Sequence, residues 1–477
     1  MLAGNVNVPN ERTPLKEHSS TTGKDTRSYT SISPLASPRA IEQLKGVDTD
    51  NVDFTQFRSE YLVKLNERPK PPMTVMDHVW NAIHITRKVV VMTMLFFVAL
   101  MMNVFQVINV ILFYWTYRKL YRLGCEVTDY FYGGFLVSIL ETMSGIDLYF
   151  YGDPNYFEPV LPDGSRLDKV ILISNHTSYA DWVIFFSAAY RRRANQLLRI
   201  FLKDVAAYIP GIGWATYLSD YFLVKKSRDR GNWQKDGQVI VDRLKNFKET
   251  DSRIWAAIFP EGTFHDRAIP DLVEKNRKFS QENGLPVLTY LLNPFPRGIT
   301  SCIQNLRGHA THVVDLTLTL TGNADPSPQA VQYVGALPLE DPARVLPDAS
   351  DGTSFRGPRA AHIHVRLHDM QDVPDDANEI RKWMSGVWQE KEKLLEYFSE
   401  HGKFPGPAYK SKSYMFWGEG KYAQNWMIRF PIFWAFVTYL FYRIASQLPT
   451  LYIQYGTIIC IVVSVTGIVI QKVCKPR

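Results

Sequence analysis

The sequence is poor in cysteine, and the few cysteines form no recognisable motif. The four residues lie far apart in a chain of 477, at Cys125, Cys302, Cys460 and Cys474. Their spacing indicates neither a disulfide framework nor a metal site, so we predict a reducing, cytosol-facing compartment and no bound metal. The N-terminus also lacks the short apolar run of a cleavable signal peptide.

Features of nucleic-acid-binding proteins are also scarce. The formal net charge is +7, but no zinc-finger spacing or basic heptad region accompanies it. A basic excess suits an anionic membrane surface or a phosphorylated substrate equally well. Long apolar runs favour these two partners, and we predict no binding of nucleic acid.

Composition divides the chain into five regions. Residues 1–75 are rich in Ser, Thr, Asn, Gly and charge, which predicts a disordered tail. The remaining predicted boundaries are 76–147 for N-terminal membrane segments, 148–325 for a catalytic domain, 326–410 for an associated C-terminal region, and 411–477 for a transmembrane hairpin with a basic tail.

The N-terminal apolar runs predict membrane segments. The run from Val89 to Trp115 is almost unbroken and exceeds the roughly 20 residues that a bilayer requires. Within it, Asn103, Gln106 and Asn109 recur every third residue, so this helix face is expected to pack on another helix. The stretch from Tyr130 to Ile146 better fits an interfacial or half-inserted helix. The first segment therefore either spans the bilayer or joins the second in a hairpin that dips into one leaflet.

Two further apolar runs predict a transmembrane hairpin near the C-terminus. They cover about Phe430–Ile444 and Leu451–Ile470, and an uncharged turn joins them. Basic residues flank the pair on both outer sides. The positive-inside rule then places both flanks, and the domain that precedes them, in the cytosol.

The region from about Leu148 to Gly406 alternates strand and helix patterns. This alternation predicts an α/β fold with a mixed, mostly parallel sheet flanked by helices. Helices are expected at Trp182–Tyr190, Gln238–Lys248 and Glu379–His401. Strands are expected at Val170–Ser174, Ile254–Phe259, Val287–Leu292, Val313–Leu320 and Ile363–Leu367.

A histidine and a carboxylate lie where one of these strands is followed by a helix. His176 is expected in the loop and Asp181 in the first helical turn. In that arrangement the carboxylate can orient the imidazole and support the imidazolium that forms when the ring accepts a proton. Such a pair, taken alone, is more often structural than functional.

A second polar cluster ends another predicted strand. Glu261, Gly262 and Thr263 offer a carboxylate, a close approach of the backbone, and a hydroxyl. Polar groups at the strand ends of one open α/β sheet commonly form a ligand site. We therefore expect this cluster to meet His176.

Together these motifs resemble the glycerolipid acyltransferase family, which includes the 1-acylglycerol-3-phosphate acyltransferases. The resemblance rests on Asn175-His176, Asp181 and the run Phe259-Pro260-Glu261-Gly262-Thr263. Three later segments are similar to the branch that holds lysocardiolipin and fungal lysophosphatidylinositol acyltransferases, namely Val314–Thr317, His362–Arg366 and Trp388–Gly406.

The resemblance implies a multi-pass enzyme of the endoplasmic reticulum membrane. It would move an acyl group from acyl-CoA, a co-substrate, to the free hydroxyl of a lysophospholipid, either 1-acylglycerol-3-phosphate or lysophosphatidylinositol. It implies no permanent cofactor and no protein partner. His176 would be the general base and Asp181 its orienting partner. The implied acceptor site comprises Asn175, Lys226, Glu261, Gly262, Thr263 and Arg297, and the implied coenzyme A contacts are Lys225, Arg228 and Arg230.

Two positions depart from the family pattern. Lys226 and Phe295 stand where the family has arginine, and Arg297 follows two residues later. A lysine keeps the charge but loses the bidentate fork toward phosphate. An alternative interpretation is therefore a non-catalytic lipid-binding membrane protein derived from this family, although the intact His176, Asp181 and Glu261 argue against it. A soluble enzyme merely tethered to membrane would not explain membrane segments on both sides of the domain.

Overall fold

The computed structural model describes residues 72–411 except 139, 142–145, 179–180, 225–229, 266–270, 323–332, 342–343 and 346–356, together with Val63, Tyr439, Tyr442 and Arg443. The predicted disordered tail therefore lies outside the described residues apart from Val63 and its last few positions. The predicted C-terminal hairpin lies outside them apart from three single residues.

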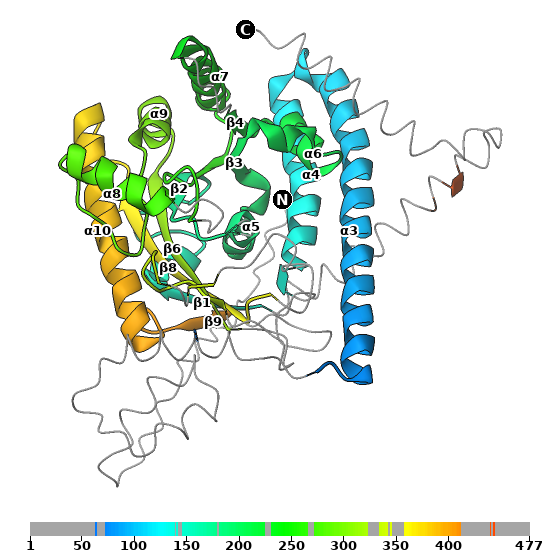
Figure 1. The fold of residues 1–477 in the computed structure, drawn as a ribbon. Coiled ribbons are helices and arrows are strands. Elements are labelled where there is room, and N and C mark those ends of the chain that lie inside the picture. The colour runs from blue at the N-terminus through cyan, green and yellow to red at the C-terminus, as the bar shows by residue number, and fades with distance from the viewer. Residues whose placement is uncertain are drawn as a thin grey trace, which may run out of the picture.

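A nine-stranded mixed sheet forms the centre of the fold (Figure 1). Its strand order is β4–β3–β5–β2–β6–β8–β1–β9, and β7 pairs with β6. The first five strands in this order are mutually parallel, whereas β8 runs antiparallel to β6 and parallel to β1. The strand bounds are β1 Asp147–Gly152, β2 Lys169–Ser174, β3 Leu198–Lys203, β4 Phe222–Val224, β5 Ile254–Ile258, β6 His312–Gly322, β7 Tyr333–Val334, β8 Ala360–Asp369 and β9 Tyr409–Ser411. The predicted α/β class with a mixed, mostly parallel sheet is confirmed.

Four of the five predicted strands are present, as β2, β5, β6 and β8. The fifth, Val287–Leu292, is wrong, because this segment forms neither helix nor strand. Its backbone N–H groups at Thr289 and Tyr290 donate to the carboxylate of Glu392 instead of to a neighbouring strand.

Helices cover both faces of the sheet, and side chains of each strand alternate between two cores. In β2, Val170 and Leu172 belong to the core that includes α5, whereas Ile171 and Ile173 belong to the core that includes α7, α9 and α10. This alternation is the period of two that a strand imposes. The helix bounds are α5 Asp181–Arg191, α6 Ile212–Leu218, α7 Arg230–Glu249, α8 Leu272–Glu282, α9 Pro296–Leu306 and α10 Ala377–His401.

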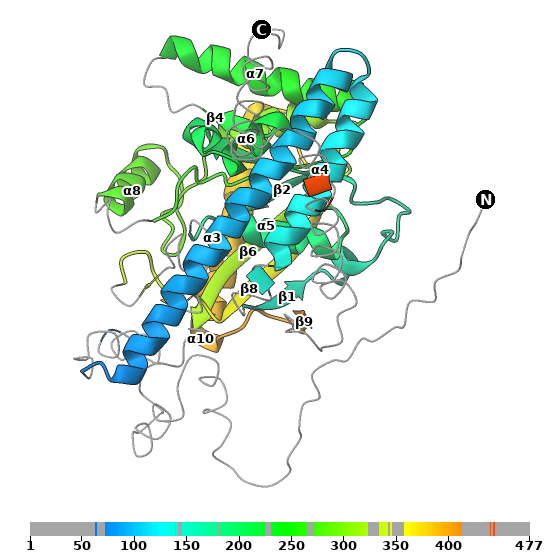
Figure 2. The ribbon, with the colours of Figure 1, turned by 90° about the vertical axis from the view of Figure 1, so that its right-hand side faces the viewer.

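Two N-terminal helices lie side by side across the α5 face of the sheet (Figure 2). Helix α3 (Val75–Asn109) continues through a π-helical turn (Val110–Tyr114), and the chain returns as α4 (Arg118–Ser138). Within the described residues, the stretch that α3 begins is the one helix long and apolar enough to cross a membrane. Apolar side chains such as Trp80 and Phe97 remain exposed along it, as expected of a lipid-facing helix.

The polar face of α3 packs against other helices, as predicted. Gln106 Nε2 donates to Ser219 Oγ at 2.9 Å, directly after α6. Asn103 Nδ2 donates to Gln106 Oε1 at 3.0 Å, and Asn109 Nδ2 donates to the Tyr121 carbonyl of α4 at 2.9 Å. These amides therefore find their partners in protein and not in lipid.

Buried ion pairs join α4 to the α/β domain. Arg122 pairs with Asp220 at 2.8 Å, and Asp129 pairs with Arg199 at 3.0 Å, with each of the four side chains at most 6% exposed. A buried charge is tolerated when it is paired and is costly when it is alone. The hairpin of α3 and α4 is thus docked as part of the domain. The predicted apolar segment from Tyr130 to Ile146 overlaps only the second half of α4. The helix begins at Arg118 and ends at Ser138, so both its ends lie earlier in the chain than predicted.

Candidate active site

The two polar clusters meet at one edge of the sheet. Strands β2 and β5 are parallel neighbours, and their last paired residues are Ile173 and Ile258. The chain segments that follow these strands therefore leave the sheet side by side. The backbone N–H of His176 donates to Glu261 Oε1 at 3.4 Å. The expected meeting of the two motifs is present.

The carboxylate of Asp181, at the start of α5, is fully buried and organises the loop that carries His176. Its Oδ2 accepts from His176 Nδ1 at 2.9 Å, from Ser178 N at 2.9 Å, and from Thr177 N. Its Oδ1 accepts from the hydroxyls of Thr177 and Ser178 at 2.7 and 2.9 Å. An ionised carboxylate can only accept hydrogen bonds, so Nδ1 carries a proton and Nε2 is left to accept one.

Aromatic rings fix the plane of the imidazole. His176 stacks on Phe259 with ring centroids 4.1 Å apart, and Phe259 stacks on Phe185 at 4.5 Å. Phe264 meets the imidazole edge-on at 5.0 Å. The His176 side chain remains 19% exposed, so a substrate can still reach it. Phe259 opens the second motif, but no pattern in the sequence indicates this stacking role.

Glu261, which accepts a hydrogen bond from the backbone N–H of His176, is 2% exposed. Burial raises the pKa of its carboxyl well above the ordinary value, opposed by the His176 N–H and by the positive charges of Arg344 and Lys391. Both cations come from the C-terminal region of the chain. Neither residue was predicted to lie near the site, and the one signal in the sequence is that Lys391 falls in the Trp388–Gly406 segment.

The turn after Glu261 is brought against the start of α9. Gly262 has φ +67°, a left-handed conformation that glycine adopts most readily. Phe295 N donates to the Pro260 carbonyl at 2.7 Å, so the first turn of α9 lies beside this turn. Arg297 is exposed in that first turn, and Thr263 is half-buried next to Gly262. The structure thus gathers these predicted acceptor-site residues in one area.

Asn175 is directed into the protein. It is 1% exposed, and its amide both donates to and accepts from the backbone of Leu318 in β6, at 2.9 and 2.7 Å. These bonds anchor the loop to the neighbouring strand. A contact between Asn175 and substrate stays a prediction.

The predicted coenzyme A contacts are not located. Lys225, Lys226 and Arg228 lie outside the described residues, and only the backbone of Arg230 is described, at the start of α7.

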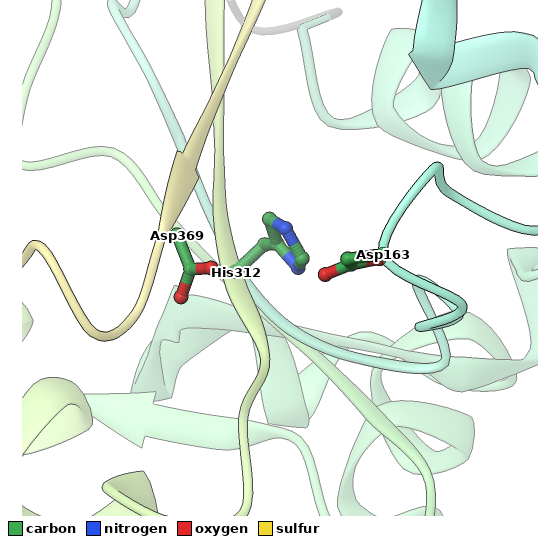
Figure 3. Close-up of side chains that lie close together, drawn as sticks. All are labelled: Asp163, His312 and Asp369. Atoms are coloured by element: carbon green, nitrogen blue, oxygen red, sulfur yellow. The ribbon is translucent and has the colours of Figure 1, made fainter.

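Three side chains with metal-ligand chemistry lie close together (Figure 3), at the start of β6, the end of that strand opposite to the loop of His176. Asp163, His312 and Asp369 each offer a ligand atom, and these atoms lie within 4.8 Å of one another. His312 begins β6 and Asp369 ends the antiparallel β8. His312 pairs with Val170, four residues before the end of β2. At about 3.3 Å per residue, the group lies about 13 Å along the strand from Ser174, which precedes the loop of His176. It is therefore separate from the site of His176.

Two family models match the chain. Acyltransferase matches residues 161–318, which include His176, Asp181 and Glu261. Acyltransferase C-terminus matches residues 355–423, which include Lys391. The two matches therefore cover both the strand ends of the site and the helix α10 behind it.

Curated relatives carry related names. A probable 1-acyl-sn-glycerol-3-phosphate acyltransferase 5 of Arabidopsis thaliana is 27% identical over 60% of this chain and 66% of its own length. An uncharacterized acyltransferase of Schizosaccharomyces pombe is 25% identical over 62% and 80%. The 1-acyl-sn-glycerol-3-phosphate acyltransferase gamma of Homo sapiens is 27% identical over 61% and 69%. Residues 161–318 and 355–423 are therefore similar to an acyltransferase domain and to the C-terminal region found in acyltransferases, and the matched motifs lie together at the strand ends of the sheet.

Proposed function

We propose that this enzyme transfers a fatty acyl group from acyl-CoA to the free hydroxyl of a lysophospholipid. The observation that carries the proposal is the 2.9 Å bond between His176 Nδ1 and the buried Asp181, which leaves Nε2 as a base. The names of the plant and human relatives support a glycerol phosphate acceptor.

The chemistry follows from this geometry. Nε2 of His176 takes the proton of the acceptor hydroxyl as its oxygen attacks the thioester carbonyl. The C–O bond forms, the C–S bond breaks, and the coenzyme A thiolate leaves and recovers a proton from the imidazolium. Asp181 stabilises the imidazolium during this exchange. Because a thiolate is a good leaving group, no covalent acyl-enzyme is required.

The acceptor proposed first is 1-acylglycerol-3-phosphate, and lysophosphatidylinositol is the second candidate. The names of the relatives favour the first, and the resemblance of segment Trp388–Gly406 favours the second. Either headgroup carries a phosphate that requires a cation. Arg297 beside the Glu261 turn is the described residue proposed for that contact, with Lys226 as its partner. Lys225, Arg228 and Arg230 are proposed to hold the phosphates of coenzyme A.

The enzyme is proposed to work at the endoplasmic reticulum membrane, with its catalytic domain in the cytosol. The long apolar helix that begins as α3 supports membrane attachment. Basic residues beside the two C-terminal apolar runs support the cytosolic side.

Acylation of lysophospholipids by microsomes tests the proposal. Wild type and His176→Ala are compared with labelled acyl-CoA and a panel of lysophosphatidic acid, lysophosphatidylinositol and lysocardiolipin. The expected result is acylation of one acceptor by wild type and almost none by the variant. Equal rates for both chains would instead support the alternative of a non-catalytic lipid-binding protein.

A further inference from the structure

Helix α10 holds a buried lysine against strand β6. The Lys391 side chain is fully buried and forms an ion pair with Asp315. Its Nζ also donates to the Leu316 carbonyl at 2.5 Å and to Thr317 Oγ1 at 3.5 Å. One ammonium group therefore binds three consecutive residues of a single strand.

The strand segment that Lys391 binds is also the anchor of the histidine loop. Asn175, which directly precedes His176, exchanges two hydrogen bonds with the backbone of Leu318. The register of β2 and β6 pairs Ser174 with Leu316, whose carbonyl Lys391 holds. A shift of this part of β6 would therefore shift the loop that carries His176.

The residue after Lys391 reaches a second segment of the site. Glu392 accepts hydrogen bonds from Tyr290 N at 3.0 Å and from Thr289 N. This segment continues to Phe295, which donates to the Pro260 carbonyl at 2.7 Å beside the Glu261 turn. Two consecutive residues of α10 thus bind the two segments that contact the motifs of the site. Lys391 binds the β6 segment next to the His176 loop, and Glu392 binds the segment that leads to the Glu261 turn.

A contribution to stability alone does not explain why a lysine is buried at position 391. Removing two charges from water offsets most of the attraction between them, and well-packed apolar residues often stabilise a core as well or better. Burial lowers the pKa of Lys391 to about 8, against the attraction of Asp315, so burial acts against its charge. An apolar side chain at this position could not supply the hydrogen bonds that Lys391 donates to β6.

We propose that Lys391 is a positioning residue for acyl transfer, which acts through Asp315 and Leu316 to hold the β6 segment that anchors Asn175 and His176. The proposal rests on the proposed function of the His176 site. It gives the C-terminal region an indirect part in the reaction, because that region then sets the position of the general base relative to the acceptor hydroxyl.

The test compares Lys391→Met with two controls on the same helix, in the full chain. Lys393→Met removes an exposed lysine that pairs with Glu390 at 2.8 Å on the solvent side. Leu395→Ala opens the core one turn beyond Lys391 on the same helix face. The measurements are kcat, the KM of each substrate, and the midpoint of thermal unfolding.

Lys391→Met is expected to lose about tenfold to 100-fold in kcat, since misplacement by 1 Å can cost about 100-fold. Its KM for acyl-CoA should stay within about twofold of wild type. Leu395→Ala should lose thermal stability with much less loss of kcat, and Lys393→Met should resemble wild type. If Lys391→Met and Leu395→Ala lose kcat in proportion to stability, Lys391 is only a structural residue and the proposal is overturned.

If the Lys391→Met protein does not accumulate in a folded form, Lys391→Arg is measured in its place. Arginine keeps the charge opposite Asp315, but its planar guanidinium places its donors at different points from the compact ammonium of Lys391. The variant is expected to fold and to lose at least about threefold in kcat, less than methionine would. Wild-type kcat in this variant would overturn the proposal. Absence of acyl transfer by the wild type would instead contradict the proposed function itself.

Discussion

Asp181 Oδ2 binds both the imidazole of His176 and the backbone N–H of Thr177, the residue that follows it. One oxygen atom therefore contributes both to the orientation of the ring and to the path of its loop. A substitution at this position changes the tautomer of the base and the shape of the loop together.

Asp181→Asn is expected to lower kcat by about 10³-fold or more, because the amide cannot hold Nδ1–H and the loop N–H groups as the carboxylate does. Initial rates at saturating acyl-CoA measure the loss. Asp163→Asn, an exposed carboxylate near the start of β6, is the control and should retain wild-type kcat. A kcat within tenfold of wild type for Asp181→Asn would contradict the assigned role.

Glu261 is expected to tolerate glutamine better than alanine. Glutamine still offers an oxygen to the His176 N–H, whereas alanine does not, so Glu261→Ala should lose about ten- to 100-fold in kcat and Glu261→Gln much less. Because burial raises the pKa of this carboxyl, its ionisation costs stability as pH rises above the unfolded value. The glutamine variant should therefore unfold no earlier than wild type at pH 8. Equal kcat losses in the two variants would show that charge, and not hydrogen bonding, matters.

Arg297→Ala tests recognition of the acceptor phosphate. Hydrogen bonds to a charged group contribute about 1.5–3 kcal/mol, so the KM for lysophosphatidic acid should rise about tenfold or more. The kcat and the KM for acyl-CoA should change little. Lys275→Ala, at an exposed position on α8, serves as the control. A rise confined to the KM for acyl-CoA would place Arg297 at the coenzyme instead.

Asp315 gives the chain a defined acid sensitivity. Burial alone would raise its pKa, but the charges of Lys391 and Arg366 outweigh burial and lower it below the ordinary value. A carboxyl of this kind stabilises the fold above its unfolded pKa, and the stabilisation disappears as pH falls through the folded pKa. Asp315→Asn should thus cost about 3–5 kcal/mol at pH 7, as expected when a buried pair is broken.

Thermal unfolding of the two proteins between pH 3 and pH 7 checks this sign. The stability difference between wild type and Asp315→Asn should be constant at neutral pH and should shrink below about pH 4, the usual range of an unfolded aspartate. A difference that stays unchanged down to pH 3 would contradict the lowered pKa of Asp315.

Elements with a local pattern could be predicted from the sequence. The apolar runs of β2 and β5 lie between turn residues, and the amphipathic period of α10 extends over most of its length. Val287–Leu292 is equally apolar, yet it is not a strand. Its backbone donors are taken by Glu392, about a hundred residues later in the chain, and no local pattern reports such a partner.

In the candidate site, too, contacts between residues close in sequence could be predicted, whereas contacts between distant residues could not. His176 and Asp181 are five residues apart, so a loop and one helical turn suffice to predict their contact. Lys391 contacts the strand that anchors the site only because α10 packs on β6, and this packing depends on the order of all the strands in the sheet. The Asn103, Gln106 and Asn109 face was predicted to need partners, but the identity of those partners, such as Ser219, came from tertiary packing.

The stack of His176 on Phe259 and Phe185 has a consequence for the speed of each catalytic cycle. A base on a mobile loop must find its reactive orientation anew whenever a substrate arrives, and this search raises the barrier. Here the ring lies on an aromatic column that continues into the core, so its rotational freedom is lost once, when the protein folds. In the proposed reaction, successive acceptor molecules then meet an imidazole that is already aligned.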